Sequence, residues 1–107
     1  MNALGIDIGT TNLNLSLLDL ETGRVLQRRS APNRRLNSPD EFAYLQDPEL
    51  IAAGVRDMVA SLGAPYHSVC VTGQVHGILY ADEAGRAVSP LMTWLDRRGT
   101  APLDASG

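Results

Sequence analysis

The feature that most constrains this chain is a strict alternation of apolar and polar residues near its N-terminus. Leu13, Leu15 and Leu17 occupy every second position, with polar residues between them. Side chains of a β-strand point alternately to the two faces of a sheet, so this spacing predicts a strand with one buried face. Turns flank it, and residues 3–8 and 25–28 also have strand composition. Three antiparallel strands are therefore expected at the start of the chain.

A helix is predicted to follow these strands. Asp47 is a suitable N-cap, Pro48 fits the first helical position, and Gly63 is a typical C-terminal stop. Apolar residues between them recur at steps of three and four, which places them on one helix face. These residues are Ile51, Val55, Met58 and Leu62, with Val59 beside them. The helix is expected to cover one face of the sheet.

After the helix, the sequence returns to strand composition. Residues 68–72 form a short apolar run that ends at Gly73, which is typical of a strand buried on both faces. Cys70 lies within this run and is expected to be a small buried residue without a redox role. Residues 77–80 and 87–88 are predicted to pair as a final hairpin. The fold class is therefore α/β, in the order βββαβ plus a hairpin.

Length and charge restrict the class of protein. A chain of 107 residues forms one domain at most, with one modest core. Its nine basic residues, all arginine, are outnumbered by twelve acidic residues, so no nucleic-acid partner is expected. A single cysteine, with no signal peptide and no long apolar run, predicts a cytoplasmic protein that does not contact membranes. The small, polar tail at 99–107 is expected to be loosely ordered.

The turn after the first expected strand has residue types that suit phosphate. Asp7 lies near the end of the strand, and Gly9, Thr10, Thr11 and Asn12 follow it. A glycine lets the backbone approach a polyphosphate, N–H and hydroxyl groups donate to its oxygens, and the carboxylate can hold Mg²⁺ through water. The alternative is an ordinary hairpin turn, which uses the same residue types for conformational reasons. Spacing alone favours this alternative.

Two later segments have side chains that suit sugar hydroxyl groups. Gln74 and His76 follow the fourth expected strand, at the kind of position where ligand sites occur in α/β sheets. In the second segment, the Trp94 indole can stack on a sugar and the Asp96 carboxylate can accept hydroxyl protons. An arginine of this segment, which contains Arg97 and Arg98, can fix that carboxylate. Each segment has a structural alternative. The histidine can make a structural hydrogen bond, and the tryptophan can pack in the core before a solvated charge run.

Taken together, the three segments resemble the FGGY carbohydrate kinases. Residues 5–11 are similar to the first phosphate motif of the actin-like ATPase superfamily. Residues 72–77 and 94–98 are similar to the Gly-Gln-Met-His-Gly and Trp-Asn/Gln-Asp-x-Arg motifs of the family. The resemblance covers essentially the whole chain and implies a ribonuclease H-like fold. Residues 88–94 are closer to sedoheptulokinase-type sequences than to xylulokinases.

The resemblance implies an ATP-dependent sugar kinase with ATP and Mg²⁺ as cofactors and a ketose such as sedoheptulose or xylulose as substrate. Asp7 would act on Mg²⁺. The residues implied for the ATP phosphates are Gly9, Thr10, Thr11 and Asn12. The residues implied for the sugar pocket are Gln74, His76, Trp94, Asp96 and Arg97.

The sequence departs from the family pattern in two places and in length. Asn14 stands where the family usually has Lys or Arg, so weaker nucleotide binding is expected. Val75 stands where the family usually has Met and glycerol kinases have Arg. His76 stands where glycerol kinases have Glu, which disfavours glycerol and favours a ketose. The family's catalytic aspartate is expected beyond Gly107, so no catalytic residue is assigned within residues 1–107. We interpret the chain as the N-terminal part of the first FGGY kinase domain, inactive when isolated.

Two other hypotheses stay open. A catalytically inactive remnant would act as a binding or interaction module, because an incomplete sheet exposes unpaired backbone groups and apolar surface that favour homo-oligomers. A non-sugar member of the superfamily, such as an actin-like or chaperone ATPase, would lack the paired features Gln74/His76 and Trp94/Asp96 and would bind no sugar.

Overall fold

The computed structural model describes residues 1–100 and 102, which fall into two compact units. The first unit comprises Met1–Arg34 and Glu49–Gln74. The second comprises Arg35–Pro48 and the residues from Val75 onward. Within the described residues, no helix has the length and apolar character needed to cross a lipid bilayer.

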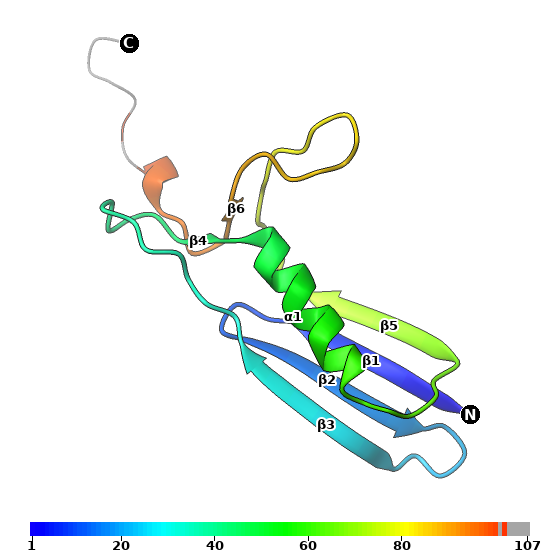
Figure 1. Ribbon diagram of the computed structural model, residues 1–107. Coiled ribbons are helices and arrows are strands. Elements are labelled where there is room, and N and C mark those ends of the chain that lie inside the picture. The colour runs from blue at the N-terminus through cyan, green and yellow to red at the C-terminus, as the bar shows by residue number, and fades with distance from the viewer. Residues whose placement is uncertain (101, 103–107) are drawn as a thin grey trace. The chain divides into compact units, whose positions relative to one another are not determined.

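The first unit is built on a four-stranded sheet (Figure 1). The spatial order is β3-β2-β1-β5, and the strands are β1 (Asn2–Ile8), β2 (Asn12–Asp19), β3 (Val25–Pro32) and β5 (Ser68–Gly73). The first three strands pair antiparallel, whereas β5 lies parallel to β1. A parallel pair requires a crossover connection. The helix α1 (Pro48–Ala60) is part of this connection and lies across one face of the sheet. Within the first unit this confirms the predicted order βββαβ.

The core of the first unit lies between this sheet face and α1. Leu13, Leu15 and Leu17 of β2 are 3%, 1% and 0% exposed, as the alternation predicts. Gly63, with φ +61°, has the left-handed backbone typical of a residue just beyond a helix. The helix face predicted from the spacing is confirmed: the residues from α1 and its C-terminal end that are buried in the core or packed against it are Ile51, Val55, Met58, Val59 and Leu62.

The strand predicted at residues 68–72 is present, but the prediction that it is buried is wrong. All six residues of β5 are exposed, including Val69 at 51% and Val71 at 59%. Among the described residues, β5 has a neighbouring strand only on its β1 side. Cys70 is also exposed, so its expected burial is wrong as well. An apolar run predicts a strand but not which of its faces are covered, and no residue of β5 belongs to the core cluster formed by the described residues.

The second unit contains two short strands that sequence patterns did not predict. β4 (Leu45–Gln46) pairs antiparallel with β6 (Leu91–Met92). Two residues are too few to show the alternation by which strands are detected. After β6, the 3₁₀-helix η1 (Arg98–Thr100) begins the tail that was expected to be loose. Residues 101 and 103–107 of that tail lie outside the described residues.

The hairpin predicted from residues 77–80 and 87–88 is only partly correct. Its turn forms, since the N–H of Gly85 donates to the carbonyl of Asp82 over 3.0 Å. One isolated bridge joins Ala81 to Ala87, but neither side is a regular strand. Ile78 instead bridges Met92 of β6. The local pairing is kept next to the turn, where the N–H of Val88 donates to the carbonyl of Tyr80 over 2.8 Å, and is absent only farther from it.

Candidate functional site

Residues 9–12, here called the Gly9 turn, connect β1 to β2. The N–H of Gly9 donates to the carbonyl of Asn12 over 2.9 Å. A Cβ atom at position 9 would lie 2.8 Å from that carbonyl oxygen, closer than real Cβ atoms approach. The turn therefore requires glycine in its first position. Thr10, Thr11 and Asn12, the other residues predicted to bind phosphate, complete the same turn.

Asn33, just after β3, holds the Gly9 turn from one side. Its Nδ2 donates to the carbonyl of Gly9 over 2.8 Å, and its backbone N–H donates to the carbonyl of Thr11 over 2.9 Å. The residue is only 8% exposed. Sequence reasoning missed Asn33 because it is 24 residues from Gly9. The two meet through the β2–β3 register, in which Asn12 lies opposite Pro32.

Replacing Asn33 with alanine is expected to destabilise the protein by about 1–2 kcal/mol, because a hydrogen bond to the Gly9 carbonyl is lost at a buried position. Asn33→Asp should do the same or worse, since a carboxylate cannot donate to a carbonyl. Urea unfolding followed by circular dichroism measures both effects. Asn37→Ala, at an exposed position, is the matched control and should change stability by less than about 0.5 kcal/mol. Equal effects at positions 33 and 37 would contradict this role.

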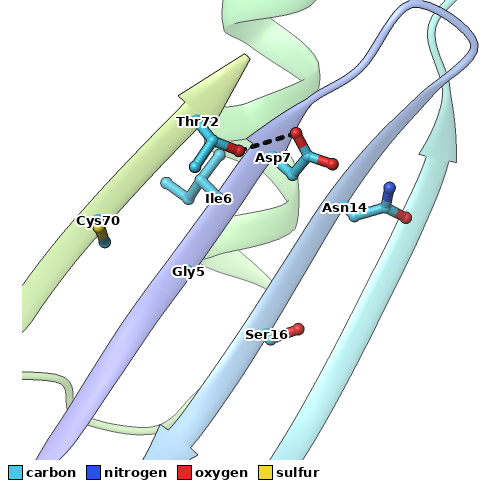
Figure 2. Close-up of a pocket in the computed structure, with 7 residues that line it drawn as sticks. All are labelled: Gly5, Ile6, Asp7, Asn14, Ser16, Cys70 and Thr72. Atoms are coloured by element: carbon cyan, nitrogen blue, oxygen red, sulfur yellow. Dashed lines mark hydrogen bonds between the residues drawn. The ribbon is translucent and has the colours of Figure 1, made fainter. Parts of the chain in front are cut away.

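Asp7 lies in an open pocket of about 250 Å³ on the sheet (Figure 2). The hydroxyl of Thr72 on β5 donates to Oδ1 of Asp7 over 2.9 Å. Asn14 of β2 lies directly opposite Asp7 in the strand register. Asp7 is therefore flanked by one polar side chain from each neighbouring strand. The remaining lining residues are Gly5, Ile6, Ser16 and Cys70.

The residues around Asp7 fit Mg²⁺ delivered with a phosphate ligand. Among residues 1–100 and 102, no three or more His, Cys, Asp or Glu side chains are grouped so that they could hold a metal ion by themselves. Protein-bound Mg²⁺ commonly takes one or two carboxylates and completes its coordination with water and substrate phosphates. Asp7 supplies one carboxylate, and the Gly9 turn begins two residues later.

Gln74 contacts the Gly9 turn from the side opposite to β3. Its backbone N–H donates to the carbonyl of Ile8 over 2.9 Å. Its Oε1 accepts a hydrogen bond from the hydroxyl of Thr10 over 3.1 Å. A residue predicted to bind sugar therefore touches a residue predicted to bind phosphate, which the sequence patterns did not indicate.

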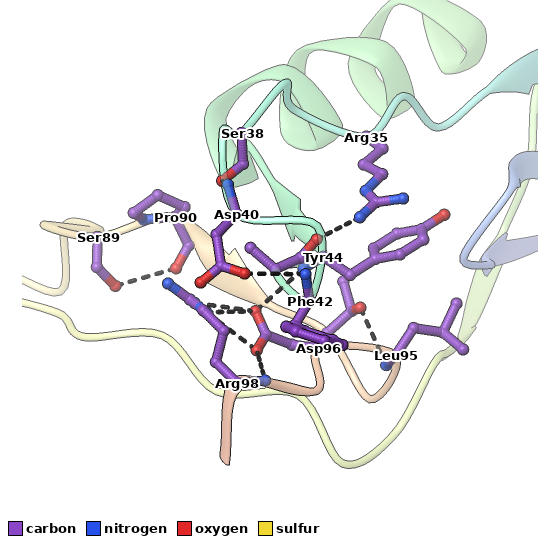
Figure 3. Close-up of polar contacts among 12 residues, drawn as sticks. Arg35, Ser38, Asp40, Phe42, Tyr44, Ser89, Pro90, Leu95, Asp96 and Arg98 are labelled. Carbon is purple, nitrogen blue, oxygen red and sulfur yellow. Dashed lines mark hydrogen bonds and ion pairs between the residues drawn. The ribbon is translucent and has the colours of Figure 1, made fainter. Parts of the chain in front are cut away.

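In the second unit, Asp96 is held by groups from two segments (Figure 3). The backbone N–H of Tyr44 donates to Oδ2 over 3.1 Å, and the Arg98 guanidinium forms an ion pair of 2.9 Å with the same oxygen. The hydrogen bond from Arg98 lowers the pKa of Asp96 below its usual value. The arginine that fixes this carboxylate is thus Arg98. The guanidinium carbon of Arg97 lies instead 5.9 Å from the centre of the Phe42 ring.

Trp94 and His76 are both exposed side chains of the second unit. Trp94 is 54% exposed, so the alternative that it packs in the core is wrong. Its neighbour Thr93 is only 4% exposed and anchors this segment through a 3.1 Å hydrogen bond from its N–H to the carbonyl of Tyr44. His76 has a φ of +61°, which is uncommon for a residue other than glycine.

The predicted site residues are divided between the two units. The first unit brings together the residues predicted for metal and phosphate with one predicted for sugar, namely Asp7, Gly9, Thr10, Thr11, Asn12 and Gln74. The second unit contains the other residues predicted for sugar, namely His76, Trp94, Asp96 and Arg97.

The lowered pKa of Asp96 predicts an acid-sensitive contribution to stability. The carboxyl group binds a proton less tightly in the folded state than in the unfolded state, where its pKa is near 3.8. Its stabilising contribution is therefore present above that pH and is lost as the pH falls through the lower folded pKa.

Asp96→Asn should remove this part of the acid dependence of stability, and Arg98→Met should move the pKa of Asp96 back towards 3.8. Carboxyl NMR titration together with unfolding at pH 2–7 checks both. An unchanged Asp96 titration in Arg98→Met would contradict the assignment.

The motifs indicate the class of protein, a carbohydrate kinase, and comparison with known proteins identifies the family. Residues 2–105 match the N-terminal domain of the FGGY family of carbohydrate kinases. The chain is 31% identical over 96 residues to a xylulose kinase of Arthrobacter sp. (strain NRRL B3728), covering 88% of this chain and 93% of that sequence. It is 28% identical over 102 residues to the xylulose kinase of Lactococcus lactis subsp. lactis (strain IL1403), covering 89% of this chain and 20% of that protein.

Solved structures agree with these matches. The crystal structure of a xylulose kinase from Rhodospirillum rubrum superimposes with a TM-score of 0.83 and 26% identity, covering 92% of this chain and 21% of that one. The chain belongs to the FGGY family of carbohydrate kinases, and its mixed α/β fold is part of the actin-like ATPase fold of those enzymes. It spans about a fifth of the length of the Lactococcus lactis protein. The preference for a sedoheptulokinase-type sequence stays a prediction.

Proposed function

We propose that the protein to which this chain belongs transfers a phosphate from ATP to a hydroxyl group of a sugar. In this proposal the chain is the N-terminal part of the first kinase domain, and the catalytic aspartate lies beyond Gly107. The family membership and the two relatives named xylulose kinase support the reaction class. An exposed free thiol at Cys70 fits the reducing cytoplasm, where we place the protein.

The observation that carries the proposal is the arrangement around the Gly9 turn. The turn is closed by its own glycine and hydrogen-bonded by Asn33 on one side and Gln74 on the other. These hydrogen bonds hold the turn in one conformation before a ligand binds. No conformational entropy is then lost in ordering the turn, which favours binding of a charged phosphate. Asp7 would hold Mg²⁺, which neutralises phosphate charge when bound. Asn14 adds no positive charge beside Asp7, so nucleotide affinity is expected to be modest.

Sugar binding is proposed for Gln74 and for four residues of the second unit. The exposed Trp94 indole offers an apolar face to the C–H groups of a sugar ring or chain. The Asp96 carboxylate is ionised at neutral pH and can accept hydrogen bonds from hydroxyl groups. We propose a ketose such as xylulose or sedoheptulose as substrate. The other proposed contacts are His76 and Arg97.

The test is a coupled assay of ADP release on the polypeptide encoded by the complete reading frame. Xylulose, sedoheptulose, ribulose, gluconate and glycerol are offered in turn with MgATP. We expect turnover that depends on a ketose and little with glycerol. The 107-residue chain alone should show no turnover, because it lacks the proposed catalytic aspartate. Absence of sugar-dependent ADP release from the complete polypeptide, with nucleotide binding intact, would refute the proposal.

One observation favours a second candidate, an inactive remnant that acts as an interaction module. β5 is an edge strand within the described residues, and Val69 and Val71 are more than half exposed. An exposed apolar edge strand promotes pairing with another chain, here a second copy. Size-exclusion chromatography of the 107-residue chain tests this second candidate. A stable monomer at all concentrations would count against the interaction module.

A further inference from the structure

We propose that Gln74 is a positioning residue for the Gly9 turn and controls the direction in which Thr10 donates its hydroxyl proton. This inference rests on the proposed function, because it takes the Gly9 turn to be the ATP phosphate site. It adds to the sugar-binding role implied for Gln74 an action on the nucleotide side of the reaction.

The position of Gln74 is set by the sheet itself. In the parallel β1–β5 register Gly73 lies opposite Ile8, so Gln74 is the first residue beyond the pairing. The backbone hydrogen bond from Gln74 to the Ile8 carbonyl continues that pairing by one step. Ile8 directly precedes Gly9. The backbone of Gln74 is thus anchored to the residue from which the turn starts, and its half-buried side chain reaches Thr10.

The chemistry follows from the single proton of a hydroxyl group. In the structure the Thr10 hydroxyl donates that proton to Oε1 of Gln74. A proton directed at Gln74 cannot at the same time be donated to a phosphate oxygen. A glutamine amide can turn about its last bond and present Nε2 instead, after which Thr10 accepts from Gln74 and its own proton is available to a phosphate. Glutamine can take both roles, whereas a carboxylate can only accept.

The experiment measures the dissociation constant of MgADP by calorimetry and the KM of the sugar in the complete protein. Gln74→Leu removes the Nε2 donor that would hold the Thr10 hydroxyl with its proton towards the phosphate. MgADP binding should therefore weaken about five-fold, the effect of losing one hydrogen bond of typical net strength. The sugar KM should rise as well, because Gln74 is also a proposed sugar contact, but that rise should not depend on residue 10. If Gln74 acts through Thr10, the five-fold effect should disappear in the Thr10→Val background and persist in the Thr10→Ser background.

Gln74→Glu provides a second variant in case Gln74→Leu folds poorly. Its carboxylate keeps the Thr10 proton and adds negative charge near the phosphates, so MgADP binding should fall at least as far. The inference is overturned if Gln74→Glu binds MgADP like the wild type, or if Gln74→Leu raises the sugar KM alone. It is also overturned if the effect of Gln74→Leu is unchanged without the Thr10 hydroxyl.

Wild-type protein that binds MgADP but phosphorylates no sugar would refute the proposed function, and the Gln74 variants would still test this inference by MgADP binding. Wild-type protein that binds no MgADP would overturn both.

Discussion

Asp7→Asn is expected to lower kcat/KM of the complete protein by at least about 100-fold. The asparagine has nearly the same shape but no charge, so it loses the electrostatic attraction to Mg²⁺, and charge stabilisation is the main contribution to phosphoryl transfer. The loss should appear mainly as a higher requirement for Mg²⁺ and a lower kcat, with sugar affinity retained. A coupled ADP assay over a range of Mg²⁺ concentrations measures this.

Two further variants make this experiment specific. Thr72→Val removes the hydroxyl that donates to Asp7 and should have a smaller effect in the same direction, because the carboxylate remains. Asp57→Asn changes an exposed carboxylate on α1 and should leave both stability and activity unchanged. If Asp7→Asn retains wild-type kcat and Mg²⁺ dependence, Asp7 has no role in metal binding.

Leu17→Ala is expected to have the largest effect on stability, a loss of about 2–5 kcal/mol. The Leu17 side chain is completely buried, at 0% exposure, in the core between the sheet and α1. Truncation removes buried apolar surface and leaves a cavity. The surrounding sheet and helix relax only partly to fill such a cavity. Since a domain is typically stable by about 5–15 kcal/mol, a loss of this size would unfold a substantial fraction of a marginal protein.

Leu20→Ala is the matched control for this variant. Leu20 lies in the turn after β2 and is 53% exposed, so the same truncation there should cost less than about 0.5 kcal/mol. Urea unfolding with the midpoint and slope determined separately checks both variants. Equal losses of stability at positions 17 and 20 would mean that the core does not depend on the buried face of β2.

Local patterns were enough to predict the first unit in outline. The alternation of Leu13, Leu15 and Leu17 identified β2 and its buried face, because neighbouring side chains of a strand must point to opposite sides. The caps and spacing at residues 47–63 identified the helix and the face that it buries. The tight turn at Gly9 was also predictable, since glycine beside hydroxyl residues is typical of such turns.

Other features depended on contacts between residues far apart in the chain. Val69, Cys70 and Val71 are exposed although their composition predicted burial, because the described residues that form the core do not include or cover β5. The two-residue strands β4 and β6 exist because distant segments meet, and neither is long enough to have a pattern of its own.

The candidate site shows the same division. Its residue types are visible in the sequence, but the support from Asn33, the contact between Thr10 and Gln74, and the choice of Arg98 for Asp96 are not. Periodicity reports which face of an element is apolar, whereas a hydrogen bond between side chains depends on strand order and register. Residue chemistry was therefore determined locally, and the partner of each side chain was decided only when the sheet assembled.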